Sequence, residues 1–288
     1  MSERAPRPHR SLRSGLGRPM DFRLLSNRLS IALPLAAGSV AGIGSLLTGG
    51  GLADAVRAGI AAGGSSFLAW AVTRELNPDH PVAASLAAVA APWATVFGSP
   101  SLAVVAVWLL AVRVVAGTTG AAPYAVDMIV VGAFTIWAST SEGGLALALL
   151  ALVAIASSTV FDARSRRTVL VGAGLATAVS LAAARAAGTL GLPEAWTAHS
   201  GWWLVAVALS TSAALLVRVE STADRRPVPI DTRRVRAATG WAGTACVIAV
   251  VWRGPVGMAS MAPVGVVLAV TATWSVARRL RGGWGGNR

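Results

Sequence analysis

Two ionisable residues lie inside long apolar runs of this sequence. Arg113 falls near the end of the run 101–117, and Asp127 falls near the start of the run 123–139. If these runs cross a bilayer, each charge costs roughly 3 kcal/mol or more at the bilayer centre unless it has a partner or a function. A short glycine-containing turn at 117–120 joins the runs, so both residues lie at similar depth on neighbouring helices. We predict that Arg113 and Asp127 form an intramembrane polar pair, either at a substrate or ion site or as a structural ion pair.

Three carboxylates in two polar loops are the candidates for metal ligands. Glu75 and Asp79 belong to the segment 74–81, the densest polar cluster in the body of the chain, and Asp162 begins a second polar loop. Divalent magnesium and calcium prefer oxygen ligands, so Glu75, Asp79 and Asp162 are candidates for a metal site. The alternative is a proline-stiffened turn in which Asp79 binds its own backbone. Because the spacing matches no metal motif, we predict neither a bound metal nor a cofactor.

The same two loops are similar, over about fifteen residues, to loops of the UbiA-type prenyltransferases. That family of polytopic membrane enzymes carries aspartate-rich motifs on the cytoplasmic loops after its second and sixth spans, where magnesium and a diphosphate bind. Here Pro78-Asp79-His80-Pro81 follows the second apolar run, and Asp162 precedes Arg166-Arg167-Thr168 after the sixth run. The repeated aspartates of the family are missing. The resemblance therefore implies a membrane-embedded enzyme as an alternative, without identifying the chain as a member.

The composition indicates what kind of molecule must position these residues. Of 288 residues, 55% are hydrophobic and 13% are charged, and the mean hydropathy is +0.64. An ordinary soluble domain carries about twice this share of charged residues. These values exclude a disordered chain, a coiled coil and a soluble nucleic-acid-binding protein, despite a net charge of +13. We predict an all-α, polytopic membrane helix bundle.

The apolar runs give the expected spans. A membrane-spanning helix needs about 20 residues, and about 17 are sufficient. Residues 1–29 form a polybasic tail, in which 21–29 is either an interfacial helix or the lead into the first span, and 282–288 form a short tail. Between them, in the helical domain 30–281, we predict ten transmembrane helices with short loops, at 30–48, 53–73, 82–98, 101–117, 123–139, 143–161, 168–187, 201–218, 236–253 and 257–277.

Glycines four residues apart predict close packing of two of these helices. Gly38 and Gly42 fall in the first run, and Gly59 and Gly63 fall in the second. Such pairs present a helix face without side chains, which lets two backbones approach closely.

The arginines predict the orientation of the bundle. All 25 basic residues are arginine, a bias that a GC-rich bacterial genome produces, and the absence of lysine excludes a Walker A or Schiff-base lysine. With ten spans and a cytoplasmic N-terminus, 22 of the 25 arginines lie on the inner side. Basic loops resist translocation, so we expect a plasma-membrane protein with both termini in the cytoplasm.

The basic segments also predict a partner. Residues 1–18 carry five arginines and too few apolar side chains to pack, so we expect a solvated arm that attracts anionic lipid headgroups of the bilayer. We expect no nucleic-acid partner. The sequence does not decide between a monomer, an oligomer and a complex with another membrane subunit.

Three functions fit these features. The first is a permease or transporter, which the span number and short loops favour, although Asp127 is the main intramembrane acid. The second is a membrane-embedded enzyme that acts on a lipid or isoprenoid at the cytoplasmic face through Glu75, Asp79 and Asp162. The third is a non-catalytic scaffold that binds partners through the basic segments. We favour transport over catalysis because the sequence contains no motif for a hydrolase, a zinc protease or a dinucleotide-binding enzyme.

Overall fold

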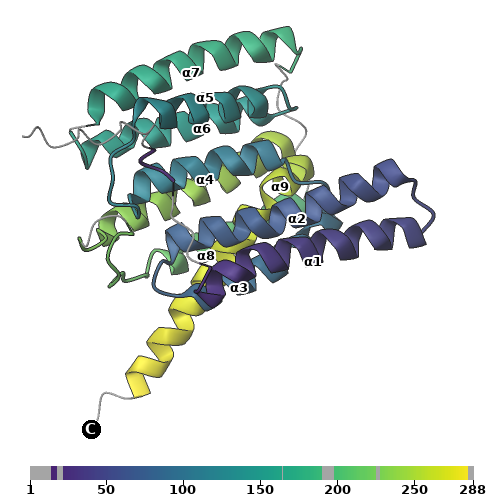
Figure 1. The fold of residues 1–288 in the computed structure, drawn as a ribbon, viewed down its shortest axis with the longest axis horizontal. Helices are drawn as coiled ribbons and strands as arrows, with labels where there is room; N and C mark the ends of the chain where they lie inside the picture. Colours follow the sequence, from purple (N-terminus) through teal and green to yellow (C-terminus); the bar gives the residue numbers. More distant parts are fainter. Residues whose placement is uncertain (1–13, 18–21, 164, 190–197, 225–227, 285–288) are drawn as a thin grey trace, which may run out of the picture.

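The computed structural model describes residues 14–17, 22–163, 165–189, 198–224 and 228–284. It is 79% helical, and the described residues contain no β-strand. The all-helical class predicted from the sequence is therefore confirmed. The helices, shown in Figure 1, are α1 (Leu25–Leu47), α2 (Leu52–Leu76), α3 (Pro81–Ala90), η1 (Ala91–Phe97), α4 (Leu102–Ala116), α5 (Ala125–Ser139), α6 (Gly144–Ser157), η2 (Ser158–Val160), α7 (Arg166–Ala186), α8 (Ala198–Ala214) and α9 (Thr232–Trp284).

The long helix α9 consists of two helices joined at a sharp break. Gly254 adopts φ 51° and ψ −129°, which lie outside the helical region. A positive φ favours glycine because a side chain there would clash with the backbone. Pro255, which has no backbone N–H to donate, follows directly. The break lets the second half of α9 pack back on the bundle as a separate segment.

The connections alternate between two ends of the bundle. At one end, Asp79 after α2 binds the backbone of Ser221 after α8, and Asp224 donates a backbone hydrogen bond to Thr118 after α4. We call this the arginine-rich end; it comprises the described residues 74–80, 113–120, 161–163, 165–167, 216–224, 228–236 and 274–281. At the opposite end, Arg253 forms an ion pair with Glu142 before α6. This alternation agrees with the up-and-down order of the predicted runs.

Among the described residues, four helices are long and apolar enough, by length and composition, to cross a membrane. They cover Leu25–Leu47, Leu52–Leu76, Arg166–Ala186 and Thr232–Leu280, and further apolar helical segments are shorter. A helix of 15 residues, such as α4, is about 22 Å long, less than the roughly 30 Å hydrocarbon core of a bilayer. The long apolar helices are thus compatible with a membrane protein. The number of ten spans is not confirmed and stays a prediction.

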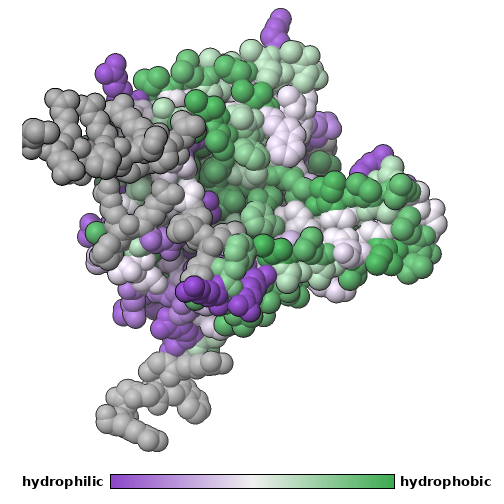
Figure 2. All heavy atoms as spheres, viewed as in Figure 1, coloured by the Kyte–Doolittle hydropathy of each residue, from purple (hydrophilic) through white to green (hydrophobic). Residues whose placement is uncertain are grey.

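Helix α4 is the centre of the core. Eleven of its 15 residues are buried, including Trp108, and it contacts α2, α5, α6 and α9. In Figure 1 it lies between α2 and the α5–α6 layer. By contrast, α1 buries only Ser30 among its 23 residues. In Figure 2, hydrophobic side chains predominate on the visible outer face of α7 and alternate with near-neutral residues on the α1–α2 hairpin, which is compatible with surfaces that face lipid.

The predicted glycine contact between the first two helices is confirmed. A Cβ atom on Gly38 would lie 2.9 Å from the carbonyl oxygen of Gly59, and one on Gly63 would lie 2.9 Å from the carbonyl oxygen of Pro34. The backbones of α1 and α2 are therefore in direct contact, and a larger side chain at these positions would force them apart.

The N-terminal region follows one of the two predicted alternatives for residues 25–29 and departs from the prediction for residues 14–17. Helix α1 runs without interruption from Leu25 to Leu47, so residues 25–29 belong to the first helix and form no separate interfacial helix. Leu16 is only 5% exposed and belongs to the hydrophobic core. The prediction of a solvated arm over residues 1–18 is therefore wrong for residues 14–17, while residues 1–13 lie outside the described part of the chain.

Candidate functional site

A buried glutamate organises the core of the arginine-rich end. Glu75, in the last turn of α2, is fully buried, and Nε of Arg113 on α4 lies 2.6 Å from its Oε1 atom. The hydroxyl of Thr118, in the turn after α4, donates to the other carboxylate oxygen. Gly117, with φ 63°, ends α4 just after Arg113 and turns the chain so that Thr118 faces Glu75. Both oxygens of Glu75 are thus occupied by protein donors.

Asp127 is also buried, and its carboxylate accepts hydrogen bonds from two backbone N–H groups and one hydroxyl. Its carboxylate accepts a hydrogen bond of 2.8 Å from the backbone N–H of Tyr124, just before α5, and one of 2.7 Å from the N–H of Gly15. The hydroxyl of Ser14 donates to the same carboxylate. An acidic side chain in the first turn of a helix is favourable because it binds free N–H groups near the positive end of the helix dipole.

The predicted direct pair of Arg113 and Asp127 is not what the structure contains. The carboxylate that pairs with Arg113 is Glu75, and the segment 14–17 lies between Arg113 and Asp127. Nη1 of Arg113 donates to the carbonyl oxygen of Leu16 at 3.1 Å, and the N–H of Leu16 lies 3.5 Å from Oδ1 of Asp127. More than one acidic residue can lie at the depth of Arg113 on a neighbouring helix. The carboxylate of Glu75 is fully buried, so an unpaired charge there would be especially unfavourable.

The three candidate metal ligands do not come together. Asp79 accepts backbone hydrogen bonds of 2.9 Å from Glu220 and 3.0 Å from Ser221, and the hydroxyl of Ser221 donates to it as well. Asp162 interacts electrostatically with Arg234. In the described ranges, no three His, Cys, Asp or Glu side chains are arranged to hold a metal ion. Glu75, Asp79 and Asp162 each have a separate structural environment and do not form the predicted candidate site.

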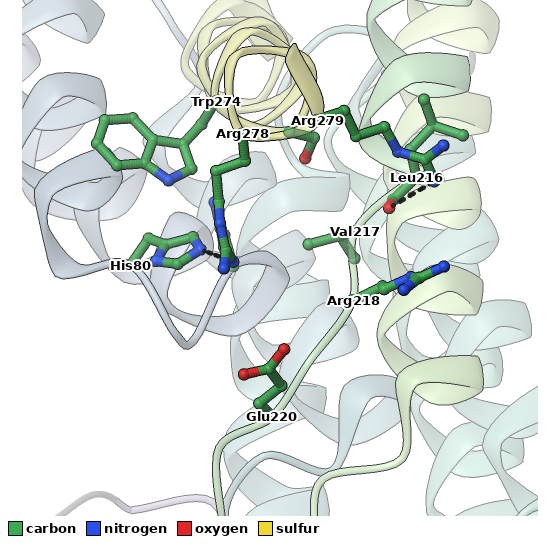
Figure 3. Close-up of a pocket in the computed structure, with 10 residues that line it drawn as sticks. His80, Leu216, Val217, Arg218, Glu220, Trp274, Arg278 and Arg279 are labelled. Carbon is green, nitrogen blue, oxygen red and sulfur yellow. Dashed lines mark hydrogen bonds between the residues drawn. The ribbon is translucent and has the colours of Figure 1, made fainter. Parts of the chain in front are cut away.

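A polar pocket opens at the arginine-rich end, between the ends of α2, α8 and α9. Its volume is about 330 Å³, at the lower limit of typical small-molecule sites. Figure 3 shows side chains from three separate parts of the chain around this space. The lining residues are Asn77, His80, Leu216, Val217, Arg218, Glu220, Trp274, Ser275, Arg278 and Arg279.

The second half of α9 places most of the basic groups in this pocket. Nη1 of Arg278 lies 2.6 Å from Nε2 of His80, and the His80 ring packs on Trp274 with 5.7 Å between the ring centroids (Figure 3). Nη2 of Arg279 donates to the carbonyl oxygen of Leu216 at 3.5 Å. Burial and the neighbouring Arg278 lower the pKa of His80, so the imidazole is neutral at pH 7 and accepts the hydrogen bond from Arg278.

The pocket also contains polar groups without partners. Both side-chain amide atoms of Asn77 are buried and have no hydrogen-bond partner within the described part of the chain, and the same holds for the indole nitrogen of Trp274 and the hydroxyl of Ser275. Buried polar atoms are nearly always hydrogen-bonded in folded proteins, so a cluster of exceptions in the wall of one pocket indicates a place for water or a ligand. With three arginines and one glutamate around it, the pocket is suited to an anion.

The sequence identified parts of this pocket without joining them. The loop at 74–81 contains the predicted metal-ligand candidates Glu75 and Asp79, and the arginines predict topology and lipid attraction only as a group. The alternation of the apolar runs is the sequence feature that connects these segments. It places the loop after the second run, the loop after the eighth run and the C-terminus of the tenth run at the same end of the bundle. Alternation does not predict which of these segments touch.

Comparisons with known protein families, with curated proteins and with solved structures find no match to this chain.

Proposed function

We propose that this chain is a multi-pass membrane permease that binds a small anion in the pocket at its arginine-rich end. The observation that carries the proposal is the joint placement of Arg218, Arg278 and Arg279 around one cavity that has a single carboxylate, Glu220. With His80 neutral, these groups give the pocket wall a net charge of +2. A cleft of one charge sign with low-dielectric walls concentrates ions of the opposite sign.

The membrane location in this proposal follows from the apolar helices and the arginine distribution. The ten helical segments, with α9 counted as two, serve as ten spans, and tilt or local thinning of the bilayer accommodates the shorter ones. The arginine-rich end then faces the cytoplasm, because basic loops resist translocation. The anion pocket opens on the cytoplasmic side, and anionic headgroups of the inner leaflet surround it.

The break in α9 supports transport rather than binding alone. The second half of α9 carries Trp274, Arg278 and Arg279 of the pocket, and it joins the first half through Gly254 at the opposite end of the bundle. The two halves of α9 are separate spans, so Gly254 is the turn between them and the covalent hinge of the second half. Rotation about Gly254 would move the basic side of the pocket relative to His80 on the α2–α3 loop.

The test measures both binding and transport. The purified chain in detergent is titrated with phosphate, sulfate and citrate, and is then reconstituted into liposomes for uptake of the radiolabelled anion. Arg278→Gln should weaken binding about tenfold, the loss expected for a charge-assisted hydrogen bond, and should reduce uptake. Arg233→Gln is the matched control, because Arg233, in the first turn of α9, is exposed at the same arginine-rich end of the bundle and does not line the pocket.

Each part of the proposal can fail separately. If none of the three anions binds, or if Arg278→Gln and Arg233→Gln weaken binding equally, the anion pocket is wrong. If anions bind with the expected dependence on Arg278 but liposomes show no uptake above protein-free liposomes, the permease function is wrong and the binding site stands.

A further inference from the structure

A second, much more apolar hollow lies on the outer side of the bundle, between α5 and α7. These helices run side by side in Figure 1, and the hollow between them has a volume of about 610 Å³. Its lining consists of alanine, glycine and larger apolar side chains of both helices, with Arg167 and Thr168 at one end and Val179 near the other. We call this hollow the α5–α7 groove.

Small residues at the contact between the two helices create the groove. A Cβ atom on Gly172 would lie 2.7 Å from the Cβ of Met128, and one on Gly132 would lie 3.8 Å from the Cβ of Ala176. The floor of the groove is therefore backbone and methyl groups. Larger side chains form its margins and are widely exposed in the isolated chain, for example Leu175 at 64%. An apolar hollow of this kind needs an apolar occupant in place of water.

The charge of the groove is confined to one end. Arg167, in the first turn of α7, is the single charged residue among the lining residues, and Thr168 beside it carries the one hydroxyl. Arg167 is exposed, and it lies at the arginine-rich end. From Arg167 to Val179 the helix rises about 18 Å, close to the depth of one hydrocarbon leaflet, which is half of a roughly 30 Å core. The groove thus combines a cationic end with an apolar length of one leaflet.

From this combination we infer that the α5–α7 groove binds one anionic phospholipid from the leaflet at the arginine-rich end. Its phosphate group pairs with the guanidinium of Arg167 and accepts a hydrogen bond from Thr168, and one acyl chain lies along Gly172 and Gly132. An arginine binds two oxygens of a phosphate through two parallel N–H donors. In a zwitterionic headgroup, the lipid's own cation neutralises the phosphate and weakens its attraction to the arginine. The inference rests on the membrane location in the proposed function, and it does not depend on the anion pocket.

The test uses the full chain purified in detergent and measures retained lipid by native mass spectrometry, with phosphatidylglycerol and phosphatidylcholine as probes. One phosphatidylglycerol per chain should bind more tightly than phosphatidylcholine. Arg167→Gln should weaken phosphatidylglycerol binding about fivefold, the effect expected for one arginine near an anionic headgroup, and should leave phosphatidylcholine unchanged. Arg166→Gln is the matched control, because Arg166 is exposed on the same turn but does not line the groove.

A second pair of variants tests the apolar part. Leu175→Trp fills the groove from its exposed margin and should reduce binding of both lipids, whereas Leu181→Trp adds the same bulk at an exposed position of α7 outside the groove. Melting of each variant shows whether it is folded. Equal lipid retention by the two tryptophan variants would place the lipid elsewhere.

The remaining outcomes also decide the question. Equal binding of the two lipids, or equal effects of Arg166→Gln and Arg167→Gln, would overturn the headgroup site. If the chain is instead a dimer that Leu175→Trp dissociates, the groove binds a second copy rather than a lipid. None of these results affects anion binding at Arg278, so failure of this inference and failure of the proposed function are distinguishable.

Discussion

Arg113 and Glu75 form a close ion pair between α4 and α2, with 2.6 Å between Nε and Oε1. The Glu75 side chain has no exposed surface and that of Arg113 is 16% exposed, so both charges lie largely outside water. Thr118 adds a third element to the cluster. By contrast, Arg57 and Asp54 form an ion pair of 3.0 Å in which both side chains are exposed. Loss of one charge should therefore reduce the free energy of unfolding more in the buried pair than in the exposed pair.

Glu75→Gln should destabilise the protein strongly. Removal of one charge from a buried pair leaves the other without compensation, at a cost of about 3–5 kcal/mol, and partial exposure of Arg113 places the expected loss at about 3 kcal/mol. Thermal unfolding of the detergent-purified variant measures this loss. Asp54→Asn is the control, with an expected change below about 1 kcal/mol because its pair is exposed. Similar melting temperatures of Glu75→Gln and the unmodified chain would show that the pair contributes little.

The segment 14–17 should be required for full stability, unlike the residues before it. Deletion of residues 1–17 removes the hydrogen bonds that Asp127 receives from Ser14 and Gly15 and the core contact of Leu16. The expected loss is about 2–4 kcal/mol, because hydrogen bonds to charged groups are the stronger class and Asp127 stays buried.

Melting of two truncated chains in detergent measures this contribution. A chain that begins at residue 14, preceded by an initiating methionine, keeps every one of these contacts and serves as the control. The two truncations should differ clearly in melting temperature. If they melt together, the segment 14–17 does not stabilise the bundle.

Stability should depend on pH through His80. Its pKa lies below the ordinary histidine value because of burial and Arg278, while Asp79 and Glu220 oppose the shift. Between the lowered folded-state pKa and the unfolded-state value of about 6.5, the unfolded chain binds more protons than the folded chain. The contribution of neutral His80 is therefore fully present above about pH 6.5 and decreases as the pH falls towards the folded-state pKa.

Melting temperatures measured between pH 5 and pH 8 test this dependence. His80→Gln keeps an acceptor for Arg278 but does not titrate, so the variant should lose the part of the pH dependence that the unmodified chain shows below pH 6.5. Identical pH profiles for the two proteins would exclude His80 as the titrating group.

The arginine-rich end should face the cytoplasm. Single cysteines at Ser99, exposed at the opposite end, and at Arg233, exposed at the arginine-rich end, report the two sides. A membrane-impermeant maleimide should label Ser99→Cys on intact cells and Arg233→Cys only after permeabilisation. The native Cys246 is buried and should remain silent, which the unmodified chain verifies. The reverse labelling pattern would invert the topology.

The sequence alone determined the helical class and the approximate position of each helix. The run 101–117 became α4 (Leu102–Ala116), and the run 123–139 became α5 (Ala125–Ser139). These features are local: a continuous apolar stretch between glycine- and proline-containing breaks favours a helix whatever it packs against. The contact between α1 and α2 was equally predictable, because adjacent runs joined by a short loop must pack as a hairpin and the glycines mark the facing sides.

The pairing of the polar groups depends on the packing of the helices, which the sequence does not reveal. Arg113 had two acidic residues at comparable depth, Glu75 and Asp127, and the helix arrangement gave it Glu75 while residues 14–17 satisfied Asp127. The pocket around Arg278 likewise joins residues about 200 positions apart in the chain. Hydropathy fixes how deep a residue lies along a helix but not the rotation of that helix or its neighbours. Partner choice depends on those two variables, and they are set by the packing of all helices together.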